Sequence, residues 1–553
     1  MTDTLNIALA QLNPVVGDIS GNVEKLREAR ARAAETGAEL VVTSELVVCG
    51  YPPEDLVFRP IVSDTVEREI EALAAETADG GPAMLVGAPL RADGKLYNAA
   101  MLLDGGKIAA VRFKHDLPNY GVFDEKRVFN AGPLPGPVNF RGVRLGVMVC
   151  EDMWTDEVAE CLQESGAEML VVLNGSPYQQ DKWDTRLNLA VARATECRMP
   201  LVYVNQVGGQ DELVFDGASF VLGRDASLRV QAPAWEESLI STQWTRNGDS
   251  WACAEGDKNP PPDGDTAIYS AMVLGLKDYV EKSGFPGVII GMSGGIDSAL
   301  TAAVAVDALG PDRVHCVMMP SPYTSKESLD DAAEACRLLG ARLNSISIEP
   351  AMGAFDEMFA DAFAGTEADT TEENIQSRSR GLALMALSNK TGSMVVSTGN
   401  KSEMSVGYAT LYGDMCGGYS VLKDVYKTKV FQLCHWRNQN KPIHVLGPDG
   451  PVIPENIIIK PPTAELKHDQ KDEDSLPPYD QLDAMLAGLN EEDRSIDDVV
   501  ADGYDRALVL RVWRMLLGAE YKRRQAPPGV KITGRSFGRD RRYPIVNAFR
   551  GKS

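Results

Sequence analysis

The chain is 553 residues long, 44% hydrophobic and 24% charged, with a formal net charge of −24. This length predicts more than one soluble globular domain. The negative charge argues against nucleic acid as a general partner, because phosphates would be repelled. The N-terminus lacks a secretory signal and no apolar run is long enough for a membrane helix, so we expect a cytoplasmic protein with no membrane partner.

Residues 5 to about 245 alternate short apolar runs with helical patterns. The expected strands are "LNIALAQL", "ELVVTSEL", "PAMLVGAPL", "VRLGVMVCEDMW", "EMLVVLNGSP" and "PLVYVNQVG". The expected helices are "NVEKLREARARAAETGA" and "DTRLNLAVARATECR". This alternation predicts an α/β domain.

Three residues of this half follow expected strands and carry reactive groups: Glu45, Lys114 and Cys150. A cysteine nucleophile needs a base and a nearby cation. Glu45 can take the thiol proton, and Lys114 can stabilise a tetrahedral oxyanion together with the backbone N–H after Cys150. Taken singly, the three also fit a capping glutamate, a surface lysine and a buried structural cysteine. The chain's nine cysteines form no C-x-x-C pair, so structural zinc is not expected.

As a set in this order, the three residues resemble the Glu-Lys-Cys triad of the nitrilase superfamily, over nearly all of residues 5–245. The resemblance implies an α-β-β-α sandwich that hydrolyses glutamine in residues 1–245. Three further residues fall where glutamine is bound: Tyr120, Ser176 and Lys182. Glu125 would brace the triad as a second carboxylate.

Residues 246–267 lose periodicity and collect Gly, Pro and Asp, which is typical of a linker. From 268 to 553 a second series of alternating helices and strands predicts a parallel sheet covered on both faces. Within it, "ELKHDQKDEDSLPP" (465–478) is too charged to pack alone and is expected to be a loop or a mobile lid.

A strand at 288–292 leads into "GMSGGIDS", and a helix follows. Glycines let successive backbone N–H groups converge on an anion, and a helix start adds its own free N–H groups. The alternative is a tight turn capped by serines. The longer string S-G-G-x-D-S resembles the pyrophosphate-binding loop of the PP-loop ATP pyrophosphatases, which implies a Rossmann-like parallel α/β fold that binds ATP. By this resemblance the loop residues Gly291, Met292, Ser293, Gly294, Gly295, Ile296, Asp297 and Ser298 contact ATP, and Asp297 holds Mg²⁺.

Four further stretches look like NAD⁺ synthetase: "TEENIQSRSRG", "VVSTGNKSEMSVGYATLYGD", "LKDVYKT" and "EYKRRQAPPGVKITGRSFGRDRRYPI". The resemblance implies that Thr398 and Lys427 contact ATP. It also implies that Asn374, Glu403 and Lys522 contact deamido-NAD, with Glu403 as a second Mg²⁺ ligand. Taken singly, these residues also fit strand ends and solvated surfaces.

The joined halves resemble glutamine-dependent NAD⁺ synthetases over the whole chain. Glutamine would form a thioester on Cys150 and release ammonia. The ammonia would attack a deamido-NAD adenylate made from ATP, giving NAD⁺ with AMP and pyrophosphate. The resemblance also implies an internal ammonia tunnel and a homo-oligomer.

Two rival functions remain open at the sequence level. One is another amidating or tRNA-thiolating PP-loop enzyme, and the other is a nitrilase-type amidase with a nucleotide-sensing second domain. The basic tail also allows two interpretations. From Lys522 onward ten Lys and Arg face a single acid, Asp540, which fits either a solvated or subunit-contact surface or a cradle for a polyphosphate substrate.

Overall fold

The chain divides into two compact units, Met1–Asp263 and Gly264–Ser553. The computed structural model describes residues 3–248, 250–468 and 470–549. The segment 246–267 is not a linker throughout, because Ser250–Cys253 form strand β15 and pair with β14 (Ser238–Asn247). Trp251 and Cys253 point into the core, so this short alternation belongs to the first unit despite its Gly- and Pro-rich surroundings.

The first unit contains two stacked sheets. The seven-stranded sheet has the order β15-β14-β1-β2-β3-β4-β5, and the six-stranded sheet has the order β13-β12-β9-β8-β7-β6. The remaining strands of the first sheet are β1 (Thr4–Gln11), β2 (Leu40–Val42), β3 (Ala83–Ala92), β4 (Lys95–Asp104) and β5 (Lys107–Phe113). Those of the second are β6 (Val138–Phe140), β7 (Val143–Val149), β8 (Met169–Asn174), β9 (Leu201–Asn205), β12 (Phe220–Leu222) and β13 (Leu228–Gln231), and a separate hairpin joins β10 (Val207–Gln210) to β11 (Leu213–Asp216).

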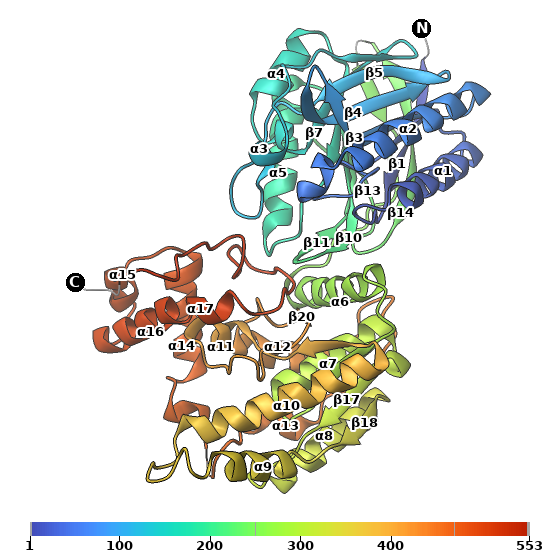
Figure 1. Ribbon diagram of the computed structural model, residues 1–553. Coiled ribbons are helices and arrows are strands. Elements are labelled where there is room, and N and C mark those ends of the chain that lie inside the picture. The colour runs from blue at the N-terminus through green and yellow to red at the C-terminus, as the bar shows by residue number, and fades with distance from the viewer. Residues whose placement is uncertain (1–2, 249, 469, 550–553) are drawn as a thin grey trace. The chain divides into compact units, whose positions relative to one another are not determined.

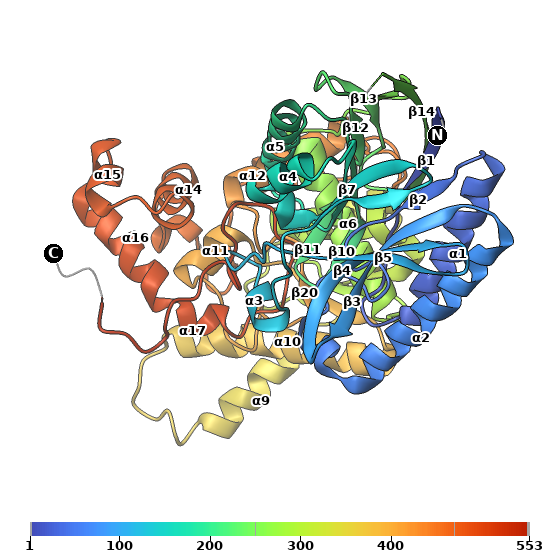
Figure 2. The same ribbon diagram turned by 90° about the horizontal axis from the view of Figure 1, so that it is seen from above.

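Helices cover the outer faces of both sheets. Helices α1 (Ile19–Glu35) and α2 (Pro60–Glu76) pack on the first sheet and lie side by side in both ribbon views (Figures 1 and 2). Helices α4 (Glu157–Glu164) and α5 (Lys182–Cys197) pack on the second. Side chains of β1 and β7 meet in a central apolar cluster between the sheets, and each helix pair encloses a cluster of its own. This is the expected α-β-β-α sandwich.

The sequence pattern shows why these elements form. Buried residues of α1 recur at helical spacing, at Val23, Leu26, Ala29 and Ala33, and Asp18 caps the helix by accepting a hydrogen bond from the N–H of Gly21. Lys114 was expected to follow a strand, but neither β4 nor β5 was among the quoted strands; β5 is half-exposed and shows no buried run, whereas most of β4 is buried.

The second unit is built on a five-stranded parallel sheet of order β18-β17-β16-β19-β20. The strands are β16 (Val288–Gly291), β17 (Val314–Met318), β18 (Arg342–Ser345), β19 (Met394–Ser397) and β20 (Tyr419–Ser420). Helices α6 (Gly264–Lys282), α7 (Ile296–Leu309), α8 (Lys326–Leu339) and α12 (Lys427–Gln439) group around one face, and α9 (Glu349–Phe359) and α10 (Thr370–Thr391) cover the other (Figure 1). The doubly covered parallel sheet confirms the expected fold class.

A helical cluster accompanies the sheet. It consists of α11 (Lys401–Val406), α14 (Tyr479–Leu486), α15 (Ile496–Ala501), α16 (Arg506–Gly518) and α17 (Glu520–Arg523), and α13 (Glu455–Ile459) lies between α12 and α14 in the chain. These helices share a core that includes Leu482, Val499, Val512 and Phe537. The expected loop at 465–478 contains a single short 3-10 turn, Asp472–Asp474, in its described part.

None of the described helices is long and apolar enough to cross a membrane. All nine cysteines are free thiols, and most of them are buried.

Candidate active sites

Three strand ends of the first unit bring Glu45, Lys114 and Cys150 together. Glu45 follows β2, Lys114 follows β5, and Cys150 directly follows β7. Glu45 and Lys114 are 0% exposed and Cys150 is 3% exposed. A fully buried ion pair is costly unless its geometry is good and its hydrogen bonds are satisfied, so these charges require close partners.

Lys114 lies between two carboxylates. Its Nζ is 2.7 Å from Oε1 of Glu45 and 2.9 and 2.8 Å from the two oxygens of Glu125. Burial alone would lower the pKa of Lys114, but Glu125 and Glu45 outweigh it and hold the pKa well above its ordinary value. Tyr51 donates a further hydrogen bond to Glu125 at 2.8 Å. Lys114 is therefore a fixed ammonium in this site, braced by Glu125.

The two carboxylate oxygens of Glu45 differ in their partners. Oε1 accepts hydrogen bonds from Lys114 Nζ and from Asn98 Nδ2, each at 2.7 Å. Oε2 is buried and has no hydrogen-bond partner among the described atoms. Oε2 is therefore the oxygen with a free lone pair for a substrate or thiol proton.

Cys150 occupies a backbone conformation that few non-glycine residues adopt, with φ of 48°. It opens a 3-10 turn, Cys150–Met153, directly after β7. Burial and then the charge of Glu45 raise the pKa of the thiol well above its ordinary value, with Lys114 opposing them. This raised pKa favours the thiol over the thiolate near neutral pH, so a base is needed to activate the sulfur.

Asp152 ties this turn to the segment that follows β5 of the other sheet. Its Oδ2 accepts from the N–H of Val149, and its Oδ1 accepts from the N–H groups of His115 and Asp116, all at 2.9 Å. Burial raises the pKa of Asp152 to about 6 despite these hydrogen bonds. Its carboxylate links the segments that carry Cys150 and Lys114.

The expected glutamine-binding residues fall into two groups. Tyr120 is 51% exposed and donates to both oxygens of Glu151 at 3.0 and 3.1 Å. Lys182 Nζ lies over the rings of Phe123 and Trp154, 5.5 and 5.7 Å from their centroids. Burial raises the pKa of Glu151, whereas Tyr120, Lys114 and Lys182 act to lower it.

Ser176 forms the second group and is buried. Its Oγ accepts from Arg186 Nε at 3.1 Å, and its carbonyl accepts from Arg186 Nη2 at 3.1 Å. Arg186 is itself held by Asp216 at 2.7 and 2.9 Å. Ser176 is thus fixed by a buried ion pair that no sequence motif indicated.

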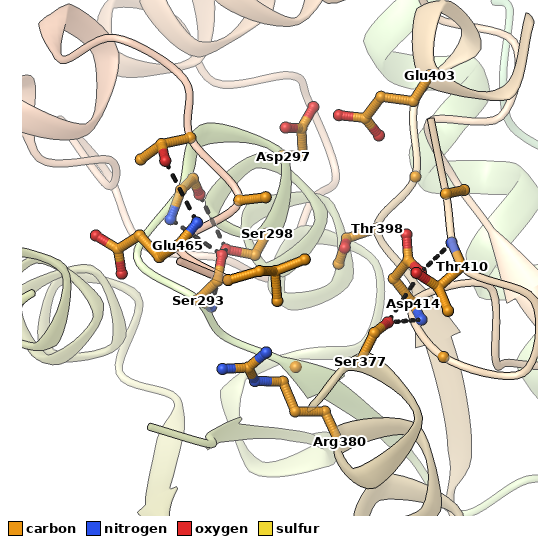
Figure 3. A pocket seen from close by; sticks show the side chains of 18 of the residues that line it. Ser293, Asp297, Ser298, Ser377, Arg380, Thr398, Glu403, Thr410, Asp414 and Glu465 are labelled. Carbon is orange, nitrogen blue, oxygen red and sulfur yellow. Dashed lines mark hydrogen bonds between the residues drawn. The ribbon is translucent and has the colours of Figure 1, made fainter. Parts of the chain in front are cut away.

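The second unit contains a cavity of about 570 Å³ at the carboxyl ends of its strands (Figure 3). Its lining includes all the expected loop residues except Gly294, together with Thr398, Lys427, Asn374, Glu403 and Lys522. Gly294 instead packs against helix α8: its φ is +81°, and a Cβ there would lie 2.2 Å from the carbonyl oxygen of Ser328.

The loop before α7 has the features of an anion site. Gly295 is the N-cap of α7 and offers no side-chain hydrogen bond to the first turn. Ser298 Oγ donates to the carbonyl of Gly295 at 2.9 Å, and the N–H of Gly295 donates to Ser293 Oγ at 3.2 Å. The loop is thereby held in shape by its own serines, with the positive end of α7 at the cavity.

Asp297 and Glu403 face each other across one side of this cavity (Figure 3). Lys427 forms an ion pair with Asp297, and its Nζ is 3.6 Å from Glu403. Burial and then Asp297 raise the pKa of Glu403 to about 8, although Lys427 opposes them. Asn400, fully buried, donates to Asp297 Oδ1 at 2.9 Å and accepts from the N–H of Glu403 at 3.0 Å.

This pair fits a magnesium ion chemically. Mg²⁺ is commonly held by one or two carboxylates plus phosphate oxygens and water, not by an all-protein cage. No group of three or more His, Cys, Asp or Glu in the described part of the chain could hold a metal ion. Asp297 and Glu403 supply the two carboxylates, and the Lys427 ammonium lies beside both of them.

Two other residues expected for deamido-NAD, Asn374 and Lys522, line the same cavity. Asn374 Oδ1 accepts from Thr410 Oγ1 at 3.0 Å. Lys522 Nζ donates to the carbonyls of Gly407 and Ala409 at 2.7 and 2.6 Å. Burial lowers the pKa of Lys522, with Asp414 opposing it. Lys522 therefore holds the 407–409 turn as well as lining the cavity.

The polyphosphate cradle expected from the basic tail is limited to Lys522, which alone among the described tail cations lines the cavity. Glu520 pairs with Arg523, Arg524 and Arg541. Lys531 pairs with Asp540, and Arg535 with Asp493. These cations meet acids close in space but up to 42 residues away in sequence, so their charge is already paired within the fold. Arg550 and Lys552 lie outside the described residues.

Sequence reasoning missed many cavity residues, and three charged ones illustrate why. Arg380, Asp414 and Glu465 line the cavity (Figure 3). Glu465 accepts hydrogen bonds from Ser325 Oγ and Ser328 Oγ, both at 2.8 Å, so the expected loop forms a wall of the cavity. Arg380 and Asp414 lie within stretches quoted above. Nothing in the spacing of those stretches distinguished the two residues from the polar residues around them.

Comparison with known protein families shows the class to which each unit belongs. Residues 6–248 match the carbon-nitrogen hydrolase family and residues 268–526 match the NAD synthase family. Each match falls on one of the two compact units, so the chain joins a carbon–nitrogen hydrolase unit to an NAD synthase unit.

Relatives that span the whole chain identify the particular family. A glutamine-dependent NAD(+) synthetase from Rhodobacter capsulatus is 50% identical and covers 100% of both chains. One from Acinetobacter baylyi is 44% identical over 99% of each chain. The solved structure of the Acinetobacter baumannii enzyme with ADP superimposes with a TM-score of 0.78 at 43% identity, again over 99% of each chain. The chain belongs to the glutamine-dependent NAD(+) synthetases and is a ligase of that family.

Proposed function

We propose that this chain transfers the amide nitrogen of glutamine to deamido-NAD, with ATP as the activating substrate. The observation that carries the proposal is the buried Glu45–Lys114–Cys150 arrangement with its one free carboxylate oxygen. The phosphate-loop cavity of the other unit supplies a separate site for activation.

In the first unit, the chemistry begins with the thiol. Oε2 of Glu45 takes the proton of Cys150 as sulfur attacks the amide carbon of glutamine. Lys114 stabilises the resulting oxyanion by its charge, since two carboxylates already occupy its N–H groups. Glu45 then returns the proton to the leaving nitrogen, which departs as ammonia. Finally, Glu45 activates water to cleave the thioester to glutamate.

Three charged or polar groups beside Cys150 fit the amino-acid end of glutamine. The carboxylate of Glu151, held by Tyr120, suits an α-ammonium group. Lys182 suits an α-carboxylate. These assignments extend the expectation that Tyr120, Ser176 and Lys182 bind glutamine by adding Glu151, the residue next to the nucleophile.

In the second unit, the carboxylate of deamido-NAD attacks the α-phosphorus of ATP, giving an adenylate and releasing pyrophosphate. Ammonia then displaces AMP to form the amide of NAD⁺. The 291–298 loop and Lys427 bind the phosphates with Thr398, while Asn374, Glu403 and Lys522 bind deamido-NAD. Asp297 and Glu403 would hold Mg²⁺, which neutralises phosphate charge when bound.

Two expectations remain part of the proposal. Free buried thiols suit a reducing compartment, which supports a cytoplasmic enzyme. A homo-oligomer is supported by exposed apolar side chains at and beyond α9 and on α10, among them Met358, Phe363 and Leu382.

The test is Cys150→Ala, which removes the sulfur without adding bulk or charge. We expect glutamine-dependent NAD⁺ formation to fall to background while formation with ammonium salts continues, more strongly at mildly alkaline pH, where more ammonia is unprotonated. The measurement is NAD⁺ formed with each nitrogen source under identical ATP and deamido-NAD. Retained glutamine use would show that the nucleophile lies elsewhere.

A further inference from the structure

Asn98 is a fully buried residue that contacts both Glu45 and Lys114, and none of the motifs above includes it. It lies on β4, opposite Pro89 of β3 and one residue before the Ala99–Phe113 pair with β5. Its side-chain Nδ2 donates to Glu45 Oε1 at 2.7 Å, and its carbonyl accepts from the N–H of Lys114 at 2.8 Å. One residue of β4 therefore ties the base and the cation of the site to the same strand.

The side-chain amide decides how the carboxylate of Glu45 is used. The terminal torsion of a glutamate is broad, so its rotamer alone does not fix which oxygen faces which neighbour. Lys114 could pair with either oxygen or with both. With the donor of Asn98 on Oε1 as well, that oxygen is occupied from two sides and Oε2 is left without a partner.

The donor at this place has to be neutral. Glu45 and Glu125 already outnumber Lys114, so another carboxylate would add repulsion in a buried site, and another ammonium would compete for Glu45. An amide donates a hydrogen bond without changing the charge. Its own Oδ1 is buried without a partner among the described atoms, a cost that an apolar side chain would not carry.

We propose that Asn98 is a positioning residue for the glutaminase reaction: it holds Oε1 of Glu45 so that Oε2 stays free to take the proton of Cys150. The proposal rests on the roles proposed above for Glu45 and Cys150. Asn98 acts through Glu45, so its loss should slow the chemical step more than it weakens glutamine binding.

The test compares Asn98→Ala, Asn98→Asp and Asn98→Ser in the full chain. We expect Asn98→Ala to lower kcat for glutamine hydrolysis roughly 10- to 100-fold, the scale of a misplaced catalytic group, with a much smaller change in KM. Asn98→Asp keeps the shape, loses the donor and adds charge, so its kcat should be lower still. Asn98→Ser retains a hydroxyl donor and should recover part of the rate.

A second readout is the rate at which iodoacetamide inactivates Cys150, which should fall in the same order as kcat. Ammonium-dependent NAD⁺ formation should stay at the wild-type level in all three variants and reports that the second unit is intact, while thermal unfolding and far-UV circular dichroism of each variant report that the first unit is folded. Asn22 gives a matched control: it is a buried asparagine bonded to the backbone of Val15 and Val48. Asn22→Ala should lower thermal stability and leave kcat for glutamine hydrolysis unchanged.

Three outcomes would overturn the proposal. Wild-type kcat and inactivation rate in a folded Asn98→Ala variant would show that Glu45 does not depend on Asn98. A rise in KM with unchanged kcat would assign Asn98 to glutamine binding instead. If Asn22→Ala lost as much kcat as Asn98→Ala, the loss of kcat in Asn98→Ala would be explained by general destabilisation of the unit. A failure of the proposed function can be told apart from a failure of this proposal, because in the first case Cys150→Ala would still hydrolyse glutamine.

Discussion

Cys150 combines two unusual residue-level properties: a left-handed backbone conformation and a thiol buried beside a carboxylate. The left-handed conformation turns the side chain away from the direction of the strand. Such a strained backbone persists where the surrounding contacts hold it in place. Asp152 provides such contacts through three backbone N–H groups. The second property keeps the sulfur protonated until a base acts on it.

The raised pKa of Cys150 makes a prediction about pH. A raised pKa means less thiolate at neutral pH than in an ordinary cysteine, with the thiolate fraction rising only at more alkaline pH. Inactivation of the substrate-free enzyme by iodoacetamide should therefore keep accelerating above about pH 9, beyond the titration of a free cysteine near 8.5. The measurement is the inactivation rate from pH 6 to 10, with Cys150→Ala as the control for other cysteines. A plateau at or below pH 8 would contradict the proposed environment of the thiol.

At the scale of elements, the turn between β16 and α7 depends on close packing against α8. Gly294 is the contact point: its backbone is left-handed, and the carbonyl of Ser328 leaves no room for a Cβ. Gly295, the next residue, has an ordinary φ of −91°, and a Cβ there would meet only Ser293 Oγ at 3.3 Å. Gly294 is therefore required by its backbone angle and its close packing, whereas neither constraint applies to Gly295.

This difference predicts unequal costs for two alanine substitutions. Gly294→Ala introduces a residue with φ above zero and forces α8 or the loop to shift, which should cost at least ~1–3 kcal/mol. Gly295→Ala should cost much less. The apparent Tm of the full chain, measured without ligands, checks the order. Equal Tm values for the two variants would show that the contact with Ser328 does not constrain the loop.

At the scale of the whole molecule, each unit has its own cores and its own site. The first unit holds Cys150, the proposed nucleophile, and the second holds the loop proposed to bind the phosphates of ATP. This division allows the nitrogen source and the activation step to be measured separately in one chain.

Release of pyrophosphate tests this division and separates the rival functions. We expect pyrophosphate to form from ATP only when deamido-NAD is present, and at the same stoichiometry to NAD⁺ with glutamine or with ammonium. The measurement is a coupled pyrophosphate assay on the full chain. Pyrophosphate release driven by tRNA would instead indicate a thiolating PP-loop enzyme, and glutamine hydrolysis without any pyrophosphate would indicate a nucleotide-sensing domain.

The sequence by itself determined the class of both units, because that information is local. Strand and helix periodicity follows from which side chains must be buried in each element. The turn before the second unit's phosphate-type loop helix is likewise encoded by one continuous stretch of eight residues, "GMSGGIDS". Glu45, Lys114 and Cys150 were found because each was expected at a strand end and because the three, in this order, resemble the Glu-Lys-Cys triad of the nitrilase superfamily. The structure places all three together.

Tertiary structure alone decided which further groups control these sites. Asn98 lies 53 residues from Glu45, and Asn400 lies 103 residues from Asp297, yet each donates to its carboxylate within 2.9 Å. Neither asparagine differs locally from other strand or cap residues. The basic tail shows the converse, since a strong compositional signal is cancelled by Glu520 and other acids that only folding brings close. Hydrogen bonds and ion pairs depend on distance in space, and for such separated residues the chain fixes that distance only when its sheets and helices have packed.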